Sequence, residues 1–366
     1  MGQKYDVAAF IWPAYSGNDP RTLPFWEEGN GEWQTVKKMK PLFEGHQWPR
    51  KPLWGYVNEA DPYVMEMEIE AAAAHGVNVF IYDWYWFDNR PFLENCLNDG
   101  YLKARNNDKV KFYLMWANHD ADTSWDKRFS DRHILLWDGA VSMKTFEYLI
   151  DRTIDKYFTH PSYYKINGKP VYMIYHLPNR VRGLGGVEAA KRGLELFRER
   201  TVKAGFAGLE LQNCIHGHSY MNKKLDENTT VLDFSNTAGF DSCTIYQFRD
   251  FISNTNRPYP EVQADMIRIL EEHQKKLSMP IHPHVSLGWD SNPRYNIFHD
   301  DVCTENTPEN IEQALRYAKE QVDTRRDLSA PLITLNSWNE WTEGSYLQPD
   351  DLYGYGYLEA VKKVFG

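Results

Sequence analysis

Cysteines are few in this sequence, long apolar runs are absent, and positive charge is in deficit. The four cysteines are scattered and form no CxxC pair, so neither a zinc cage nor a disulfide framework is indicated. No stretch approaches the roughly 18 apolar residues that a membrane span requires. A net charge of -10 argues against a protein that binds nucleic acid phosphates or anionic lipid. The remaining class is an ordinary globular protein.

The amino terminus carries no recognisable export signal. A strand-like run begins at about Val7, which leaves no room for the charged stretch, the apolar stretch and the cleavage site of such a signal. The opening Met1-Gly2 is equally compatible with a start that follows a removed signal. Localisation therefore stays open, with the periplasm and the cell surface among the alternatives.

Short apolar runs alternate with amphipathic stretches along the chain. We expect strands at residues 7–12, 77–84, 111–116, 170–175, 209–214, 242–246, 281–287 and 332–337. We expect helices at residues 62–75, 144–158, 187–204, 259–276 and 308–325. Asp61-Pro62 and Thr307-Pro308 mark two helix starts, because each is a capping residue followed by proline.

Eight strands that alternate with helices fit a closed parallel barrel better than a doubly wound sheet, and no GxGxxG motif follows the first strand. The sequence therefore predicts an α/β fold, with one catalytic domain over residues 1–366 that forms a single (β/α)8 TIM barrel. Two connections are long: residues 16–61, before the first helix, and residues 118–142, after the third strand. Loops of this length in a compact domain are usually functional.

Aromatic side chains make up 15% of the sequence, with 13 Trp and 23 Tyr. Their apolar faces and polar edges suit sugar rings, although a large aromatic core would give the same composition. Position decides, because a barrel gathers functional groups at the carboxyl ends of its strands. At these ends stand Tyr15, Asp83, Tyr85, Trp86, Trp116, Asn118, His119, Asn213, His216, Tyr246, Trp289 and Asp290. We expect them to line a cleft for an oligosaccharide or polysaccharide.

The segment Asn336-Ser-Trp-Asn-Glu-Trp-Thr-Glu-Gly344 closes the last strand and contains two glutamates three residues apart. If the chain turns helically there, Glu340 and Glu343 project to one side. Glycoside cleavage needs such a pair, because one acid protonates the leaving oxygen while the other acts as base or nucleophile. Surface acids at a helix start give the same spacing. Trp338, Asn339 and Trp341 beside them favour a catalytic pair in a sugar-binding site.

Four residues have two interpretations each. Asp83 and Asp290 either are catalytic acids in their own right, or they hold sugar hydroxyls or orient Arg294 and the glutamates. Glu32 and His46, on the first long connection, either fold over the cleft or only shape the loop. Arg294 and both loop residues are therefore candidates for substrate binding.

Histidines and one charged pair complete the candidates. His216 is placed either for substrate contact or for a loop role. His282 and His284 face the same side of a strand, but no carboxylate constellation accompanies them, so no metal and no other cofactor is expected. Arg90 and Glu94, four residues apart, are expected to form an ion pair that fixes the loop after the second strand.

A series of motifs along the chain points to a known family. The motifs are Pro41-Leu-Phe-Glu-Gly-His46, Tyr85-Trp-Phe87 with Arg90 and Glu94, Trp116-Ala-Asn118, Trp289-Asp290 with Pro293-Arg294, the segment from Asn336 to Gly344, and Tyr353-Gly-Tyr-Gly-Tyr357. In their order and spacing they resemble the family 99 glycoside hydrolases. They resemble more closely the WbsX-type proteins, which are named as glycosyltransferases of polysaccharide biosynthesis.

The family 99 resemblance implies an endo-acting α-mannoside hydrolase that retains the anomeric configuration. It implies that Glu340 deprotonates the 2-hydroxyl of the sugar, which then attacks the anomeric carbon. Glu343 would protonate the leaving oxygen and later activate water. Two departures concern the sugar: His119 stands where WbsX-type sequences carry Glu, and Trp12-Pro-Ala-Tyr15 replaces their Tyr-Pro-Gln-Phe-His. They leave the identity of the sugar open.

Three functions therefore compete. The first is a retaining glycoside hydrolase. The second is a glycosyltransferase, although the sequence contains no evident cradle for a nucleotide diphosphate. The third is a non-catalytic barrel that binds glycans, against which the presence of both glutamates argues.

Overall fold

The computed structural model describes residues 4–366, so Met1 and Gly2 lie outside the described residues. Its centre is a sheet of parallel strands: β1 (Asp6–Ile11), β2 (Val79–Phe87), β4 (Lys111–Trp116), β8 (Lys169–Ile174), β9 (Glu210–Ile215), β10 (Ser242–Ile245), β11 (His284–Ser286) and β12 (Leu332–Asn336). Around the sheet they follow the order β10-β9-β8-β4-β2-β1-β12-β11. Eight parallel strands thus form a nearly closed barrel, and the predicted fold is confirmed.

The barrel closes only loosely between β10 and β11. The amide of Cys243 donates to the Pro280 carbonyl at 3.0 Å, and the amide of His282 donates to the Cys243 carbonyl at 2.8 Å. Pro280 and Pro283 have no N–H group and interrupt a continuous ladder. For this reason β11 is shorter than the strand expected at residues 281–287.

Helices cover the barrel: α1 (Trp33–Lys37), α2 (Pro62–Ala74), α3 (Met143–Thr153), α4 (Leu177–Leu184), α5 (Val187–Lys203), α6 (His218–Met221), α7 (Val231–Thr237), α8 (Tyr259–Gln274), α9 (Pro308–Thr324) and α10 (Gly356–Phe365). The two predicted caps are confirmed, since Asp61 accepts from the Tyr63 amide and Thr307 from the Asn310 amide. In residues 4–366, no helix combines the length and the apolar character needed to cross a membrane.

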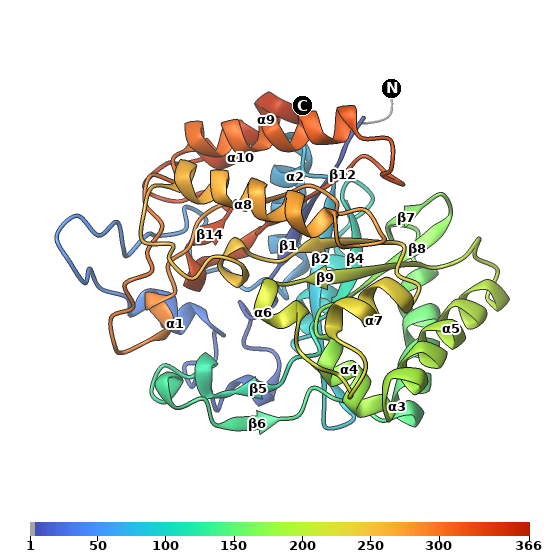
Figure 1. Ribbon diagram of the computed structural model, residues 1–366. Helices are drawn as coiled ribbons and strands as arrows, with labels where there is room; N and C mark the ends of the chain where they lie inside the picture. The colour runs from blue at the N-terminus through green and yellow to red at the C-terminus, as the bar shows by residue number, and fades with distance from the viewer. Residues whose placement is uncertain (1–3) are drawn as a thin grey trace.

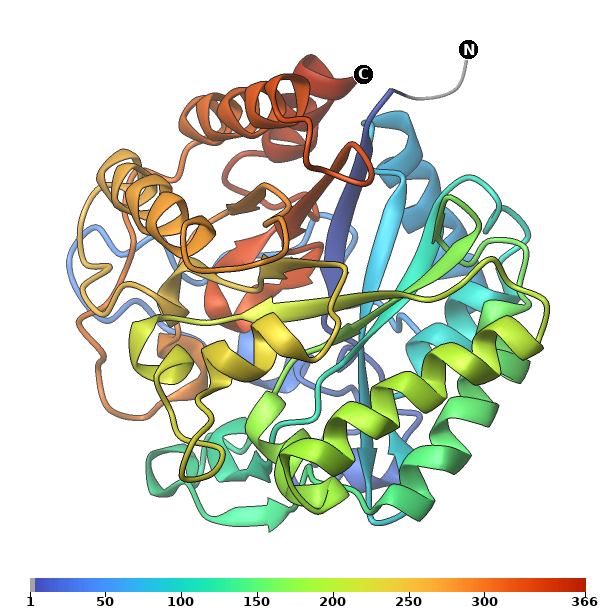
Figure 2. The same ribbon diagram turned by 45° about the vertical axis from the view of Figure 1, so that its right-hand side comes forward.

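The start of β1 and the carboxyl terminus lie at one end of the barrel, and a hairpin of β5 (Ala121–Asp122) and β6 (Leu135–Trp137) lies at the opposite end (Figures 1 and 2). β1 runs from the end that holds the carboxyl terminus toward the hairpin end, so the parallel strands have their carboxyl ends there. Both long connections are present. The first contains α1, and the second contains the hairpin. Four short strands complete the fold: β3 (Arg90–Phe92), β7 (Lys165–Ile166), β13 (Asn339–Glu340) and β14 (Ser345–Tyr346).

Candidate active site

A cavity of about 400 Å³ lies at the carboxyl ends of the barrel strands, and we call it the active-site cavity. Its carboxylates are Asp83, Glu340 and Glu343, with Arg294 beside them. Its other side chains are Trp12, Tyr85, Met115, Ala117, His119, Trp125, Tyr175, His176, His216, Tyr220 and Tyr246. Acids and aromatic rings therefore meet in one hollow, as the strand-end pattern led us to expect.

One guanidinium group brings three carboxylates together. Arg294 Nη2 donates to Glu340 Oε1 at 2.8 Å, and Nη1 donates to Glu343 Oε1 at 2.6 Å. Nε of the same side chain donates to Glu32 Oε1 at 3.0 Å. Burial alone would lower the pKa of Arg294, but these carboxylates raise it well above its usual value. Arg294 is thus a permanent cation that fixes both glutamates and ties the first long connection to the cavity.

The two glutamates converge because the chain turns sharply after β12. Glu340 ends β13, and Glu343 ends the 3-10 turn η9 (Trp341–Glu343). Gly344 then adopts a left-handed backbone with φ +63°, and a Cβ atom there would lie 3.1 Å from Asp290 Cβ. Glycine alone fits this position without strain. The turn directs both carboxylates toward Arg294, so they project to one side, as expected from the three-residue spacing.

Three residues beside the glutamates, which we predicted to bind substrate, do not line the cavity. They anchor the segment from Asn336 to Gly344 on its buried side. Trp338 Nε1 donates to Glu68 Oε2 at 2.8 Å, and Asn339 Nδ2 donates to Glu59 Oε2 at 2.8 Å. Trp341 Nε1 donates to Gln348 Oε1 at 2.6 Å. All three side chains are fully buried. They anchor the segment to the body of the barrel.

Burial dominates the electrostatics of the glutamates. Burial raises the pKa of Glu340 well above its usual value, and the neighbouring Glu343 raises it further while Arg294 opposes the shift. Burial also raises the pKa of Glu343, again against the effect of Arg294. Two acids so close, with one shared cation, do not both ionise readily. The pair can therefore supply one proton donor and one acceptor.

Three histidines form part of the cavity wall. His119 Nδ1 lies 2.7 Å from the Asp120 carbonyl, and burial lowers the pKa of His119. Burial lowers the pKa of His176 to about 3, so this ring is neutral at physiological pH. His216 Nε2 lies 3.1 Å from the Tyr175 carbonyl. A neutral ring such as that of His176 can both donate to and accept from hydroxyl groups.

Five more of the predicted substrate-binding residues lie outside the cavity lining. Trp86 stacks on Trp84, and Trp116 stacks on Phe146. Asn118 exchanges hydrogen bonds with the backbone of His176, and Asn213 donates to Ser235. Tyr15 is also buried away from the cavity; its hydroxyl accepts from the Trp341 amide at 3.1 Å.

A second hollow of about 300 Å³ adjoins the active-site cavity. It contains the predicted residues His46, Trp289 and Asp290. His46 Nε2 lies 2.7 Å from Asp290 Oδ2. Asp290 also accepts from the Asn292 amide, and so shapes the turn that carries Arg294. The structure thus separates these three residues from the hollow that contains the glutamates.

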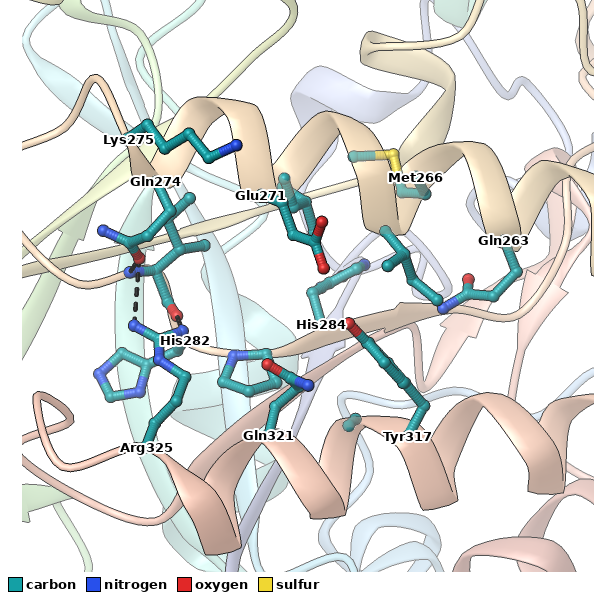
Figure 3. A pocket seen from close by; sticks show the side chains of 15 residues that line it. Gln263, Met266, Glu271, Gln274, Lys275, His282, His284, Tyr317, Gln321 and Arg325 are labelled. Carbon is teal, nitrogen blue, oxygen red and sulfur yellow. Dashed lines mark hydrogen bonds between the residues drawn. The ribbon is translucent and has the colours of Figure 1, made fainter.

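His282 and His284 belong to neither of these hollows. They form the floor of a third, outer hollow between α8 and α9 (Figure 3). His284 is hydrogen-bonded through both ring nitrogens, to Thr334 and to Ser286. Across residues 4–366, no three His, Cys, Asp or Glu side chains are grouped so as to hold a metal ion.

The expected ion pair of Arg90 with Glu94 is wrong. Glu94 is buried and binds Arg152 at 2.6 Å and 2.7 Å, while Arg90 is exposed. A buried carboxylate needs a close cation, and α3 supplies one from far along the chain. Side chains four residues apart face each other only in a helix, and the segment from Arg90 to Glu94 begins with the strand β3.

Trp125 is the main cavity residue that sequence reasoning missed. It stands in the second long connection, and its ring lies 5.5 Å from Trp12 and 5.8 Å from Tyr85. The sequence did contain a signal for this residue, because a tryptophan in a loop expected to be functional is a candidate for substrate binding. Trp12, Tyr175, His176 and Tyr220 also line the cavity, all close to predicted strand ends.

Two solved structures share the fold of this molecule. The GH99 endo-alpha-mannosidase from Bacteroides thetaiotaomicron superimposes with a TM-score of 0.56 at 16% identity, over 98% of this chain and 95% of that one. A glycoside hydrolase-like protein superimposes with a TM-score of 0.61 at 14% identity, over 100% and 94% of the two chains. At these identities the likeness concerns the fold.

The chain belongs to the family described as Glycosyltransferase WbsX, whose model matches residues 7–361. It is 25% identical to the uncharacterised protein WxcX of Xanthomonas campestris pv. campestris, strain B100, over 98% of this chain and 49% of that protein. The chain therefore spans about half the length of the curated relatives it matches.

Proposed function

We propose that this chain is a retaining glycoside hydrolase that cleaves an α-linked glycan with Glu340 and Glu343. The observation that carries the proposal is the convergence of both carboxylates on Arg294, at 2.8 Å and 2.6 Å, on the wall of an aromatic cavity. A surface pair at a helix start would face water and would not need a buried cation.

The two glutamates have different surroundings that suit different roles. Glu340 is almost fully buried and receives hydrogen bonds from Arg294 and Tyr246, which stabilise its ionised form. Burial raises the pKa of both glutamates, so the difference lies in accessibility: 14% of the Glu343 side chain is exposed against 2% of that of Glu340. We assign Glu340 as the base and Glu343 as the acid.

The reaction then proceeds in two balanced steps. Glu340 takes the proton of the 2-hydroxyl, O2 bonds to the anomeric carbon, and the leaving oxygen takes the proton of Glu343. In the second step Glu343 takes a proton from water, the water oxygen bonds to the anomeric carbon, and the bond between that carbon and O2 breaks. O2 regains its proton from Glu340. Two inversions at one carbon give net retention.

The substrate class follows from the cavity. Arg294 is the only Lys or Arg among the described residues that line it, and three carboxylates already occupy its guanidinium group. A neutral sugar is therefore favoured over an acidic one. The solved endo-alpha-mannosidase of the same fold makes α-mannosides the first substrates to test.

The test is hydrolysis of a panel of α-linked glycans by wild type, Glu340→Gln and Glu343→Gln. Glu210→Gln is the matched control, because Glu210 is a buried glutamate that begins β9 and lies outside the cavity. We expect both cavity variants to lose more than about 10³-fold in kcat and the control to keep its activity. If neither variant affects cleavage, the assignment is wrong.

The family description makes glycosyl transfer the second candidate. A nucleotide-sugar donor would bring a diphosphate, which needs free cations or helix amides. The same panel offered with nucleotide-sugar donors separates the two reactions. Transfer of sugar that survives Glu340→Gln would favour the transferase, and glycan binding without turnover would favour a non-catalytic barrel.

A further inference from the structure

Tyr246 stands between two carboxyl groups of the active-site cavity. Its hydroxyl oxygen lies 3.0 Å from Asp83 Oδ2 and 3.0 Å from Glu340 Oε2. Tyr246 comes directly after β10, and Asp83 comes from β2, so the three groups meet across the barrel. Asp83 is buried, with 4% of its surface exposed.

A hydroxyl group has one proton to donate. It can therefore donate to Asp83 or to Glu340, but not to both. If both carboxyl groups were ionised, a lone pair of the tyrosine oxygen would face an anion at 3.0 Å. The geometry is satisfied when one carboxyl group carries a proton and donates it to Tyr246, while Tyr246 donates to the other.

The surroundings of the two carboxyl groups differ. Glu340 Oε1 accepts from Arg294 at 2.8 Å, so a cation stabilises its negative charge. Asp83 has no ion-pair partner among the described residues, and its Oδ1 atom is buried without a hydrogen-bond partner there. Burial of this kind raises the pKa of Asp83 well above its usual value, and the nearby charge of Glu343 adds to the effect.

We propose that Asp83 is a positioning residue that holds the one proton of the Asp83–Tyr246–Glu340 chain and thereby keeps Glu340 ionised. Asp83 donates to the Tyr246 oxygen, and the Tyr246 hydroxyl donates to Glu340 Oε2. Glu340 then meets the substrate as a carboxylate in a fixed orientation. The role of Asp83 in the reaction rests on the proposed function, since it assumes that Glu340 acts as the base. The location of the proton on Asp83 does not depend on the proposed function.

The location of the proton is measured by infrared spectroscopy of the substrate-free protein at neutral pH, in the region of the protonated carboxyl C=O stretch. We expect a band in wild type that Asp83→Asn removes and Glu340→Gln retains. Tyr246→Phe should shift the band, because the hydrogen-bond acceptor of the acid is lost. Asp290→Asn is the control and should leave the band in place, because Asp290 is a buried aspartate in the second hollow.

Kinetics on a cleaved glycan separate positioning from bulk stability. Asp83→Asn keeps a neutral side chain that can donate to Tyr246, so we expect kcat to fall less than about tenfold with KM little changed. Asp83→Ala should lower kcat by about a hundredfold, because Tyr246 loses its support. Loss of the band in Glu340→Gln but not in Asp83→Asn would overturn the proposal, and so would equal kcat in Asp83→Asn and Asp83→Ala. If the band behaves as expected but no glycan is cleaved, the proton assignment stands and the proposed function fails.

Discussion

Asn339 and Trp12 are joined by two hydrogen bonds. The Trp12 amide donates to Asn339 Oδ1 at 2.8 Å, and Asn339 Nδ2 donates to the Trp12 carbonyl at 2.9 Å. The Asn339 side chain thus pairs with the backbone of Trp12 in the way that a neighbouring strand would. It links the residue after β1 to the residue before Glu340. The two hydrogen bonds fix the position of Glu340 at the carboxyl end of the barrel, although the Asn339 side chain does not line the cavity.

Replacement of Asn339 therefore tests whether this buried side chain positions Glu340. Asn339→Ala leaves buried backbone groups of Trp12 without partners, so we expect a loss of about 1–3 kcal/mol in unfolding free energy. Displacement of Glu340 should lower kcat by about 10–100-fold. Urea unfolding and steady-state kinetics measure the two effects. Asn222→Ala, at an exposed asparagine after α6, is the control; an unaltered kcat in Asn339→Ala would contradict this role.

Removal of Arg294 should change the pH dependence of the reaction. Arg294 lowers the pKa of Glu340, so Arg294→Met should raise that pKa further. A base must be ionised to act, and the acidic limb of the pH–rate profile should therefore move to higher pH. Arg294→Lys keeps the charge but cannot bridge three carboxylates, so its limb should lie between those of the other two proteins. A limb that moves to lower pH would contradict the electrostatic assignment.

The same substitution should weaken the fold. Arg294→Met leaves buried carboxylates without a cation, for which a cost of about 3–5 kcal/mol is usual. The free energy of unfolding, measured near neutral pH, should fall by this amount. The loss should shrink at acidic pH as the carboxylates become protonated. A constant difference across pH would show that packing, and not charge, is responsible.

Glu68 links stability to pH. Burial raises its pKa from the ordinary value of 4.5 to about 7. The folded state therefore binds this proton more tightly than the unfolded state. The resulting stability is fully present below pH 4.5 and is lost as pH rises through about 7. Glu68→Gln keeps the acceptor for Trp338 and has no proton to lose.

We expect Glu68→Gln to gain on the order of 3 kcal/mol relative to wild type between pH 4.5 and pH 8. Chemical unfolding at several pH values measures the difference. Glu66→Gln is the control, because Glu66 is a more exposed glutamate on the same helix, paired with Arg105. A pH-independent difference between Glu68→Gln and wild type would mean that Glu68 does not titrate in this range.

Trp125 should contribute to sugar binding. Its ring packs beside Trp12, Tyr85 and His119 in the wall of the cavity. Trp125→Ala removes an apolar face and should raise KM about tenfold with a smaller effect on kcat. Phe129→Ala, a change at an exposed ring of the same connection, is the matched control. A fall in kcat alone would indicate that Trp125 affects the chemistry instead.

The alternation of side chains along a strand explains which of the predicted aromatic residues line the cavity and which do not. Side chains alternate between the two faces of a strand. Asp83 and Tyr85 line the cavity, so Trp86 must point toward the helices, and Met115 and Ala117 likewise leave Trp116 outside. The sequence contained this information, because residues that share a strand end cannot all face inward.

Other features depended on contacts that no local pattern encodes. The partner of Glu94 is Arg152, 58 residues away, and Glu59 meets Asn339 across 280 residues. Helix caps, strand positions and the spacing of the two glutamates are local and could be predicted. The division into two neighbouring hollows depends on how the long first connection folds back, which composition alone does not specify.

The configuration of the first released sugar tests the central claim most directly. Wild-type protein is mixed with an α-linked glycan that it cleaves, and the product is followed by proton NMR before the anomers equilibrate. Catalysis by Glu340 and Glu343 with participation of O2 predicts that the α-anomer appears first and that Glu340→Gln forms no product. Initial release of the β-anomer, or unchanged release by Glu340→Gln, would contradict the account.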